Sequence, residues 1–556
     1  MNYGIRVVAL SGALLVLNLT AEGQVQEHWA VMFNGPANHA DNAYALAVDS
    51  AGFIIVAGDT RTGQSTSDST DYAVVKYAPT GDTLWARYYN GPANRRDVAR
   101  SVSVDVSGNV YVVGESYGTS DYDIATVKYN ASGDFQWASR YNGPANGADG
   151  GASVAVDASG NVYVTGYSDG DASPVLRQDD FVTIKYDAAG AGQWARRYNG
   201  PGAFHDIGRA VAVDASGNVY ITGESSGSGT RYDYATIRYN PAGDSLWVRR
   251  YNGPANYNDR STALRLDGKG GVYVTGSSDG SSSSNQDYAT IKYDTAGTEQ
   301  WLSRYDGPGG GDDAFALSCD GGNNVYVTGE SRGPAPSYSY DYLTLRLNAV
   351  TGDTIWSARY DGGALGLDAA ISVAVDARGI VLVTGYSTGT SSQLDVATLG
   401  YDSLGAQRWA RRYSSNGSFN DQGVAVALDH LGTIYVAGSS YGGAQGNNFI
   451  LFKFTDTGGA VGVEQPAGAY EFSLSDNYPN PFNPETTIEF MVAHAGPVTL
   501  EVFDMLGRKL ETLVEGELAA GRYRFVWSAR GLASGMYAYR LRSGEYSAVK
   551  KLLVLK

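Results

Sequence analysis

The sequence predicts an all-β protein: an eight-bladed β-propeller of four-stranded blades, followed by a small immunoglobulin-like β-sandwich. Two observations predict the propeller. Eight tryptophans recur at intervals of 52 to 57 residues, and each interval holds four short runs rich in Val, Ile, Tyr and Thr. A third predicts the sandwich, because about seven more strand-like runs follow the repeats. The repeating residues are Trp29, Trp85, Trp137, Trp194, Trp247, Trp301, Trp356 and Trp409.

The first segment, residues 1–23, is predicted to be a secretory signal peptide. One positive charge in MNYGIR precedes the apolar run VVALSGALLVLNLTA, which small residues close near Ala21. A membrane-spanning helix needs about 20 apolar residues and this run has only about 15, so we expect no transmembrane segment in the mature chain.

Composition narrows the classes of partner. The formal net charge of −17 and the absence of a long basic run in the sequence argue against nucleic acid, whose phosphates such a chain would repel. Because Cys319 is the single cysteine of the sequence, no intrachain disulfide can form. An exported chain of this size is therefore expected to rely on packing and strand pairing.

Residues 24–455 are predicted to form the propeller. A typical unit contains the runs WASRY, ASVAVD, NVYVTG and FVTIKY, separated by Gly, Asn, Asp and Pro. If each blade runs from VAVD inside to W-RY outside, the array begins with an orphan outer strand at residues 28–33. It ends with three inner strands, the last at residues 448–454. These two fragments are expected to complete one blade and close the ring non-covalently.

The spacing within the repeats predicts which face of the propeller binds the ligand. The distance from the Asp of VAVD to the Gly of YVTG is nine residues in every unit, whereas the loop from that Gly to the third strand varies from 9 to 14. In an up-and-down blade this variable loop shares a face with the blade-to-blade connection YNGPAN. Since recognition usually lies on surface loops of a rigid scaffold, we expect this face to bind the ligand.

The sequence of the repeats, with VAVDASGNVYVTG and DYATIKYNPAGDSLW, resembles the bacterial SBBP-type β-propeller repeats over about residues 28–455. The resemblance implies the fold and says little of function, because propellers host enzymes, binders and scaffolds alike.

One aspartate recurs eight residues before the VAVD-type Asp of every unit, at the mouth of the innermost strand. Eight carboxylates around an axis could bind a hard cation such as Ca²⁺. Alternatively, each could fix the blade-to-blade turn or pair with a repeated base such as Arg140, Arg197 or Lys128. The candidates are Asp41, Asp97, Asp149, Asp206, Asp259, Asp312, Asp368 and Asp421. A second set precedes the third strand and is expected to close loops: Asp71, Asp123, Asp180, Asp233, Asp287, Asp341 and Asp395.

No catalytic set is predicted, because the five histidines fall at unrelated repeat positions. An enzyme on the propeller scaffold stays as the alternative, either a polymer hydrolase or lyase or a quinoprotein-like dehydrogenase. The segments AGDSLW and TGDTIW look similar to quinoprotein repeats. However, each Trp lies on the same strand face as a Tyr, as in Trp137 and Tyr141, which favours packing between blades.

Residues 456–472 read as a Gly-rich linker, and residues 473–556 as the sandwich. The motifs of this last segment and their order resemble those of the type A C-terminal sorting domain of type IX secretion substrates. The matching motif residues are Tyr478, Pro479, Pro481, Phe482, Pro484, Gly507, Arg508, Gly535, Tyr537, Lys550 and Lys551.

That resemblance implies export by the type IX secretion machinery of a Gram-negative bacterium, to the outer cell surface or the medium. The expected function is a non-catalytic binding, adhesion or scaffold module that presents its variable-loop face to an extracellular ligand, either a glycan or a protein.

Overall fold

The computed structural model describes residues 25–63, 69–170, 178–202, 204–280, 286–320, 324–334, 339–363, 366–389, 393–415, 420–442 and 446–456. In the C-terminal part it describes 472–475, 477, 480–482, 485–492, 496–518, 521–529, 532–544 and 546–555. Within these ranges the chain forms strands and their connections, and no helix is present that could cross a membrane. The predicted signal peptide and nearly all of the predicted linker lie outside the described residues.

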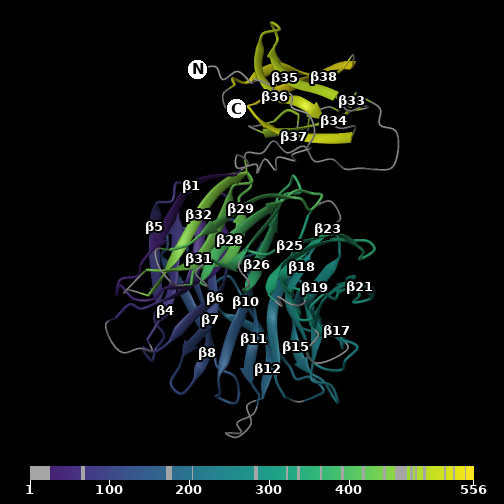
Figure 1. Ribbon diagram of the computed structural model, residues 1–556. Helices are drawn as coiled ribbons and strands as arrows, with labels where there is room; N and C mark the ends of the chain where they lie inside the picture. The colour runs from purple at the N-terminus through teal and green to yellow at the C-terminus, as the bar shows by residue number, and fades with distance from the viewer. Residues whose placement is uncertain are drawn as a thin grey trace.

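Eight four-stranded antiparallel sheets follow one another through the described part of residues 25–456, as the propeller prediction requires (Figure 1). Seven of them use four consecutive strands. The first four are β2 (Asn42–Val48), β3 (Ile54–Thr60), β4 (Asp71–Tyr77), β5 (Thr83–Tyr89); β6 (Asp97–Val104), β7 (Val110–Tyr117), β8 (Tyr122–Tyr129), β9 (Phe135–Tyr141); β10 (Asp149–Val156), β11 (Val162–Asp169), β12 (Asp179–Tyr186), β13 (Gly192–Tyr198); and β14 (Asp206–Val213), β15 (Val219–Ser226), β16 (Tyr232–Tyr239), β17 (Ser245–Tyr251). The next three are β18 (Asp259–Leu266), β19 (Val272–Asp279), β20 (Gln286–Tyr293), β21 (Glu299–Tyr305); β22 (Asp312–Cys319), β23 (Asn324–Arg332), β24 (Tyr340–Asn348), β25 (Thr354–Tyr360); and β26 (Asp368–Val375), β27 (Val381–Thr388), β28 (Leu394–Tyr401), β29 (Gln407–Tyr413).

The eighth sheet combines the two ends of the array. It contains β30 (Gln422–Leu428), β31 (Ile434–Tyr441), β32 (Asn447–Asp456) and, as its outer strand, β1 (Val25–Phe33). β1 pairs antiparallel with β32, with Val31 opposite Leu451. The predicted non-covalent closure is confirmed. In the described part of the chain each of the eight blades therefore has four strands, and the closing blade exposes the same kind of short outer edge as the others.

The first strand of each blade lies toward the middle of the ring and the tryptophan-bearing strand at its edge. Figure 1 shows β10 and β26 near the middle and β5 and β21 at the periphery. The inner strand starts at the connection from the preceding blade. At this end the amide of Asp97, on β6, donates to the carbonyl of Thr70 at 2.6 Å, just before β4. The inner strand starts and the ends of the variable loops are therefore neighbours.

The hydrophobic cores of the propeller lie between neighbouring blades. One core joins Ile55, Tyr72 and Val74 of the first blade to Val112 and Val127 of the second. The tryptophan of each outer strand bridges the same kind of boundary. In seven blades its Nε1 donates to a backbone oxygen in the turn after the next blade's third strand, and Trp409 donates to the carboxylate of Asp456 at the end of β32. This packing between blades is what the Trp and Tyr spacing predicts.

The C-terminal part forms two sheets around one core, the arrangement of a β-sandwich. One sheet contains β33 (Ser473–Leu474), β34 (Glu485–Val492) and β37 (Gly521–Ser528); the other contains β36 (Lys509–Leu518), β35 (Gly496–Asp504), β38 (Gly535–Ser543) and β39 (Tyr546–Val554). Ile488 and Trp527 from the first sheet share the core with Leu500 and Tyr539 from the second. The immunoglobulin-like strand order stays a prediction.

The packing of Trp137 against a glycine of the next blade gives a first testable prediction. Gly190 has a φ of +85°, and a Cβ there would lie 2.5 Å from Cδ2 of Trp137. Gly190→Ala should therefore lower the free energy of unfolding by roughly 1–3 kcal/mol, measured by urea denaturation. Gly192→Ala, two residues further along, is the matched control, because nothing lies within 4 Å of its Cβ position. Equal stability of the two variants would contradict this role for the tryptophan.

Candidate functional site

The eight repeated aspartates are fully buried at the starts of the inner strands, and each accepts a hydrogen bond from the blade-to-blade connection. The donors are the backbone amides of Gly35, Gly91, Gly143, Gly200, Gly253, Gly307, Gly362 and Ser415, at 2.6 to 3.0 Å. The second carboxylate oxygen of Asp97 accepts from the amide of Tyr117 at 3.1 Å, which ties the connection to the end of β7. These contacts correspond to the turn-fixing alternative.

The repeated arginines pair with the second set of aspartates, not with the first. Arg140 lies 2.6 Å from Asp123, and Arg197 lies 2.9 Å from Asp180. Lys128 donates instead to the carbonyl oxygen of Ala188. The second alternative, pairing of these bases with the Asp41-type residues, does not agree with the structure, because the outer strand reaches the start of the third strand and not that of the first.

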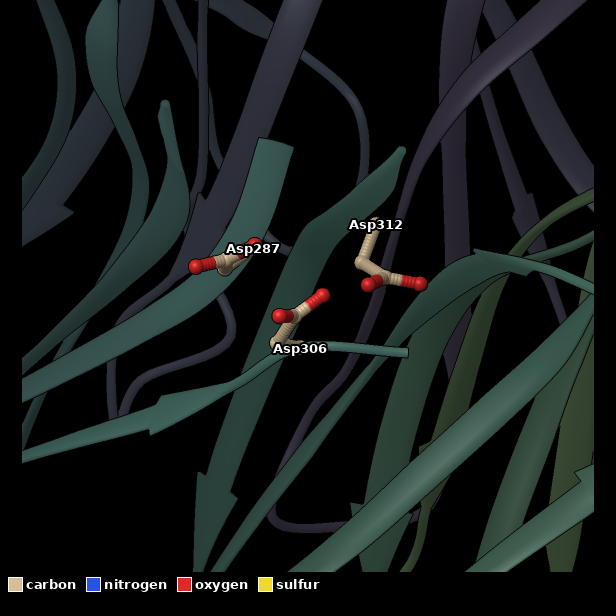
Figure 2. A group of neighbouring side chains, drawn as sticks. All are labelled: Asp287, Asp306 and Asp312. Carbon is tan, nitrogen blue, oxygen red and sulfur yellow. The ribbon is translucent and has the colours of Figure 1, made fainter. Parts of the chain in front are cut away.

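Two blade boundaries gather three carboxylates each. In one, Asp287 at the third strand, Asp306 in the connection and Asp312 at the inner strand each place one oxygen within 4.8 Å of the others. Figure 2 shows that these three side chains come from separate segments. The other group is Asp341, Asp361 and Asp368. Each group arises because the sequence has Asp at a position where five other repeats have Asn.

Arginines and backbone amides of the protein already bind carboxylates of these two groups. Arg304 lies 2.6 Å from Asp287, and Arg359 lies 2.7 Å from Asp341. Asp312 accepts from Gly307 and Asp368 from Gly362. Burial raises the pKa of Asp312 and of Asp368, as expected for carboxyls removed from water. A cation would have to compete with a guanidinium in both places.

A cavity of about 840 Å³, lined by both polar and apolar groups, lies among the inner strands, at the end where the connections and variable loops are found. Side chains from the third position after the repeated aspartate reach it from six blades: Tyr44, Arg100, Ala152, Arg209, Thr262 and Phe315. Its volume is in the range of small-molecule sites.

Ion pairs arrange one side of the cavity. Arg209 Nη2 donates to Glu224 at 2.5 Å, and Arg260 Nε lies 2.8 Å from the other oxygen of the same carboxylate. Arg100 pairs with Glu115, through an Nε donation at 3.0 Å. Two guanidiniums from neighbouring blades therefore share one carboxylate.

Two carboxyls face each other on the side of β22 and β23. Asp313 is the antiparallel partner of Glu330, and the hydroxyl of Ser277 hydrogen-bonds to Asp313. Burial, and then the charge of Asp313, raises the pKa of Glu330 to about 7. Burial also raises the pKa of Asp313. A carboxyl of this kind exchanges a proton near neutral pH.

These cavity residues were not predicted from the sequence. The differences between repeats could have indicated them. The residue directly after the Gly of the second strand changes in charge and size from repeat to repeat, whereas the residues on either side of it recur. That position is Asp59, Glu115, Tyr167, Glu224, Ser277, Glu330, Tyr386 and Ser439. Which of them converge on one cavity depends on the ring.

The sorting motif residues that the structure describes support the sandwich. Phe482 is buried, and its backbone amide donates to the carbonyl of Leu553 at 3.0 Å. Gly507 adopts a φ of +79° in the turn that Asp504 caps, where Arg508 also pairs with Asp504 at 2.6 Å. Tyr478, Pro479 and Pro484 lie outside the described residues. The others are placed at Pro481 before Phe482, at Gly535 and Tyr537 on β38, and at Lys550 and Lys551 on β39.

Two family models match the chain. Residues 476–555 match the secretion system C-terminal sorting domain. Residues 136–171 and 193–229 match the β-propeller repeat known as SBBP. The chain therefore carries SBBP repeats and a type IX C-terminal sorting domain, and is exported to the cell surface or secreted.

Two curated proteins are similar over parts of their length. The regulatory protein FlaEY of Caulobacter vibrioides is 30% identical over 146 residues, which cover 24% of this chain and 15% of FlaEY. The WD repeat-containing protein L264 of Acanthamoeba polyphaga mimivirus is 22% identical over 447 residues, covering 66% of this chain and 31% of that protein. The chain thus spans less than a third of either relative.

Among solved structures, Sqt1 from Chaetomium thermophilum matches 76% of this chain and 99% of its own, with a TM-score of 0.44 and 10% identity. An endo-arabinase from Bacteroides thetaiotaomicron matches 47% of this chain and 94% of its own, with a TM-score of 0.25 and 11% identity.

The acidic groups give a second prediction. We expect the melting temperature of the mature protein to be the same within about 1 °C in excess Ca²⁺ and in chelator, because Arg304 and Arg359 already neutralise one carboxylate in each group. Calcium at a hundred times its dissociation constant would add about 2.7 kcal/mol of stability to a real site. A rise in melting temperature that is lost in the double variant Asp306→Asn, Asp361→Asn would overturn this expectation and establish a metal site.

The sorting domain gives a third prediction. On intact cells, added proteinase should digest the full-length protein, whereas a chain lacking residues 473–556 should stay inside the cell and be protected. A periplasmic protein without this domain is the control for cell integrity. An intracellular pool of both forms would contradict the sorting role.

Proposed function

We propose that this protein is an exported, non-catalytic binding module whose ligand contacts the variable-loop face and the cavity beneath it. The observation that carries the proposal is the cavity of about 840 Å³, lined by residues that differ from blade to blade. The proposal divides the chain into a signal peptide (1–23), the propeller (24–455), a linker (456–472) and the sorting sandwich (473–556).

The contrast between framework and lining supports a binding role. The repeated aspartates and tryptophans serve contacts within and between blades, in the same way around the ring. In the six blades that reach the cavity, the third position after the repeated aspartate carries Arg in two blades and Tyr, Thr, Phe or Ala in the others. A repeated framework with a varied lining suits recognition, because lining residues can change without loss of the fold.

A rigid, exported scaffold also suits adhesion, which is the same binding function with a surface as the ligand. Screening the labelled mature protein on arrays of glycans and extracellular proteins tests both forms. Binding that is lost when cavity arginines are replaced supports the proposal. Attachment of cells that does not change when the gene is deleted argues against adhesion.

The rival function is a secreted hydrolase acting on an extracellular polymer. The pair formed by Asp313 and Glu330 favours it, because two carboxyls side by side, one with a pKa of about 7, can act as acid and base. Release of reducing ends from a polysaccharide panel, abolished by Glu330→Gln, would replace binding by catalysis. The quinoprotein alternative has less support, since the tryptophans donate to the neighbouring blade.

The raised pKa of Glu330 gives a fourth prediction. Its pKa is about 7 in the folded protein against an ordinary 4.5, so the folded state holds this proton more tightly than the unfolded state. The resulting stabilisation is complete below about pH 4.5 and is lost as the pH rises through about 7. As the pH rises from about 4.5 to about 7, the free energy of unfolding of Glu330→Gln should therefore increase by about 1–3 kcal/mol relative to that of the wild type.

Denaturant titrations of both proteins at pH 4.5, 6 and 7.5 measure this difference. Glu299→Gln, at an exposed position on β21, is the control for the charge change. A constant difference between Glu330→Gln and wild type across the series would show that this partly buried carboxyl does not titrate in this range.

A further inference from the structure

Three arginines expose their guanidinium groups to the cavity of a chain whose formal net charge is −17. Arg100, Arg209 and Arg260 come from three different inner strands, β6, β14 and β18. Their side chains are 36%, 46% and 47% exposed, whereas the paired side chains of Glu115 and Glu224 are only 15% and 6% exposed. A ligand in the cavity therefore meets the guanidiniums before it meets the carboxylates that hold them.

The guanidiniums are held in place before a ligand arrives. Arg100 stacks over the ring of Tyr44 at 5.2 Å, and Arg260 over the ring of Tyr232 at 5.2 Å. The shared carboxylate of Glu224 sets the distance between Arg209 and Arg260. Guanidinium groups fixed in this way lose little conformational freedom on binding, and their N–H groups match the two oxygens of a carboxylate.

The remaining lining limits what the rest of the ligand can be. The lining holds three arginines and three acidic residues, Glu115, Glu224 and Asp313, so a carboxylate would be recognised by the exposed guanidinium groups and not by a net positive charge of the cavity. Asp313 and Ser277 lie beside Arg260 and offer acceptors and a hydroxyl. Phe315 adds an apolar ring surface, and Gly151 and Ala152 leave room between Arg100 and Arg209. A ring compound with one carboxylate and several hydroxyls meets all of these groups.

We propose that the cavity binds a sugar-acid residue of an acidic polysaccharide, with the carboxylate on Arg209 and Arg260 and the ring hydroxyls on Asp313 and Ser277. This inference rests on the proposed binding function and names the substrate class. The carboxylate accepts from guanidinium N–H groups, and the hydroxyls donate to the carboxyl of Asp313. Phe315 covers the apolar face of the sugar ring.

Isothermal titration of the full secreted protein with a galacturonate trimer tests the proposal. We expect the trimer to bind, and its methyl ester, which has the same shape without the charge, to bind at least tenfold more weakly. Arg209→Gln and Arg260→Gln should each weaken binding of the acid about tenfold or more, as expected when a charge-assisted hydrogen-bonded pair is removed. Arg260→Lys keeps the charge without the planar fork and should restore only part of the affinity.

The matched control is Arg265→Gln. Arg265 lies on the same strand as Arg260, five residues further along β18, so the variant removes the same charge about 16 Å away. Its affinity for the trimer should stay within twofold of the wild type. Melting temperatures of all variants establish that they are folded before the affinities are compared.

Three results would overturn the inference: no binding of the acid, equal binding of acid and ester, or unchanged affinity in both Arg209→Gln and Arg260→Gln. Citrate that binds as tightly as the trimer would also overturn it, because the site would then select a carboxylate without the sugar. If the protein binds another glycan or a protein on the arrays but not the uronate, this inference fails while the proposed binding function stands.

Discussion

The contact between a tryptophan and a glycine of the next blade, described at seven blade boundaries, is the interaction on which the rest of the propeller depends. At seven boundaries the indole lies so close to a glycine of the next blade that a Cβ there would be 2.5 to 3.0 Å from the ring. The glycine has a positive φ, which only this residue adopts without strain. The indole N–H then donates into the same turn. Because the contact always runs to the next blade, it fixes the angle between blades and so closes the ring.

Closure of the ring gives the inner strand starts their role. Buried aspartates there accept hydrogen bonds from backbone amides of the connections. Without the aspartates these amides would be buried without partners. The arginines of the outer strands are drawn to the neighbouring carboxylates at the starts of the third strands. The framework contacts occupy these groups, so the charged side chains that a ligand could reach are those lining the cavity, above all Arg209, Arg260 and Asp313. The sorting sandwich supplies export, so the ligand proposed for this cavity would be one found outside the cell.

Much of the fold could be predicted because its signals are local and repeated. The period of the tryptophans, the nine-residue hairpin and the orphan strand at residues 28–33 led to eight blades and the closing pair of β1 and β32. The candidate site was harder. The Asp41-type residues were chosen as candidates because they recur in every repeat. They recur because each makes the same structural hydrogen bond to the blade-to-blade connection, as Asp41 does with Gly35. Arg260 and Glu224 did not stand out, because each occupies its repeat position alone or with few equivalents, and their ion pair joins residues 36 positions apart in two blades.

The sequence by itself determined the strands, their order within each blade, the closure and the export signal, because alternation, turn residues and motif spacing act over short distances along the chain. Only the tertiary structure decided which side chains meet at the axis. Arg100, Arg209, Arg260 and Asp313 are separated by whole blades in the sequence, and the ring brings them to one cavity. The partner of each charge is likewise set by distances across sheets and blade boundaries, and such distances depend on the closed ring as a whole.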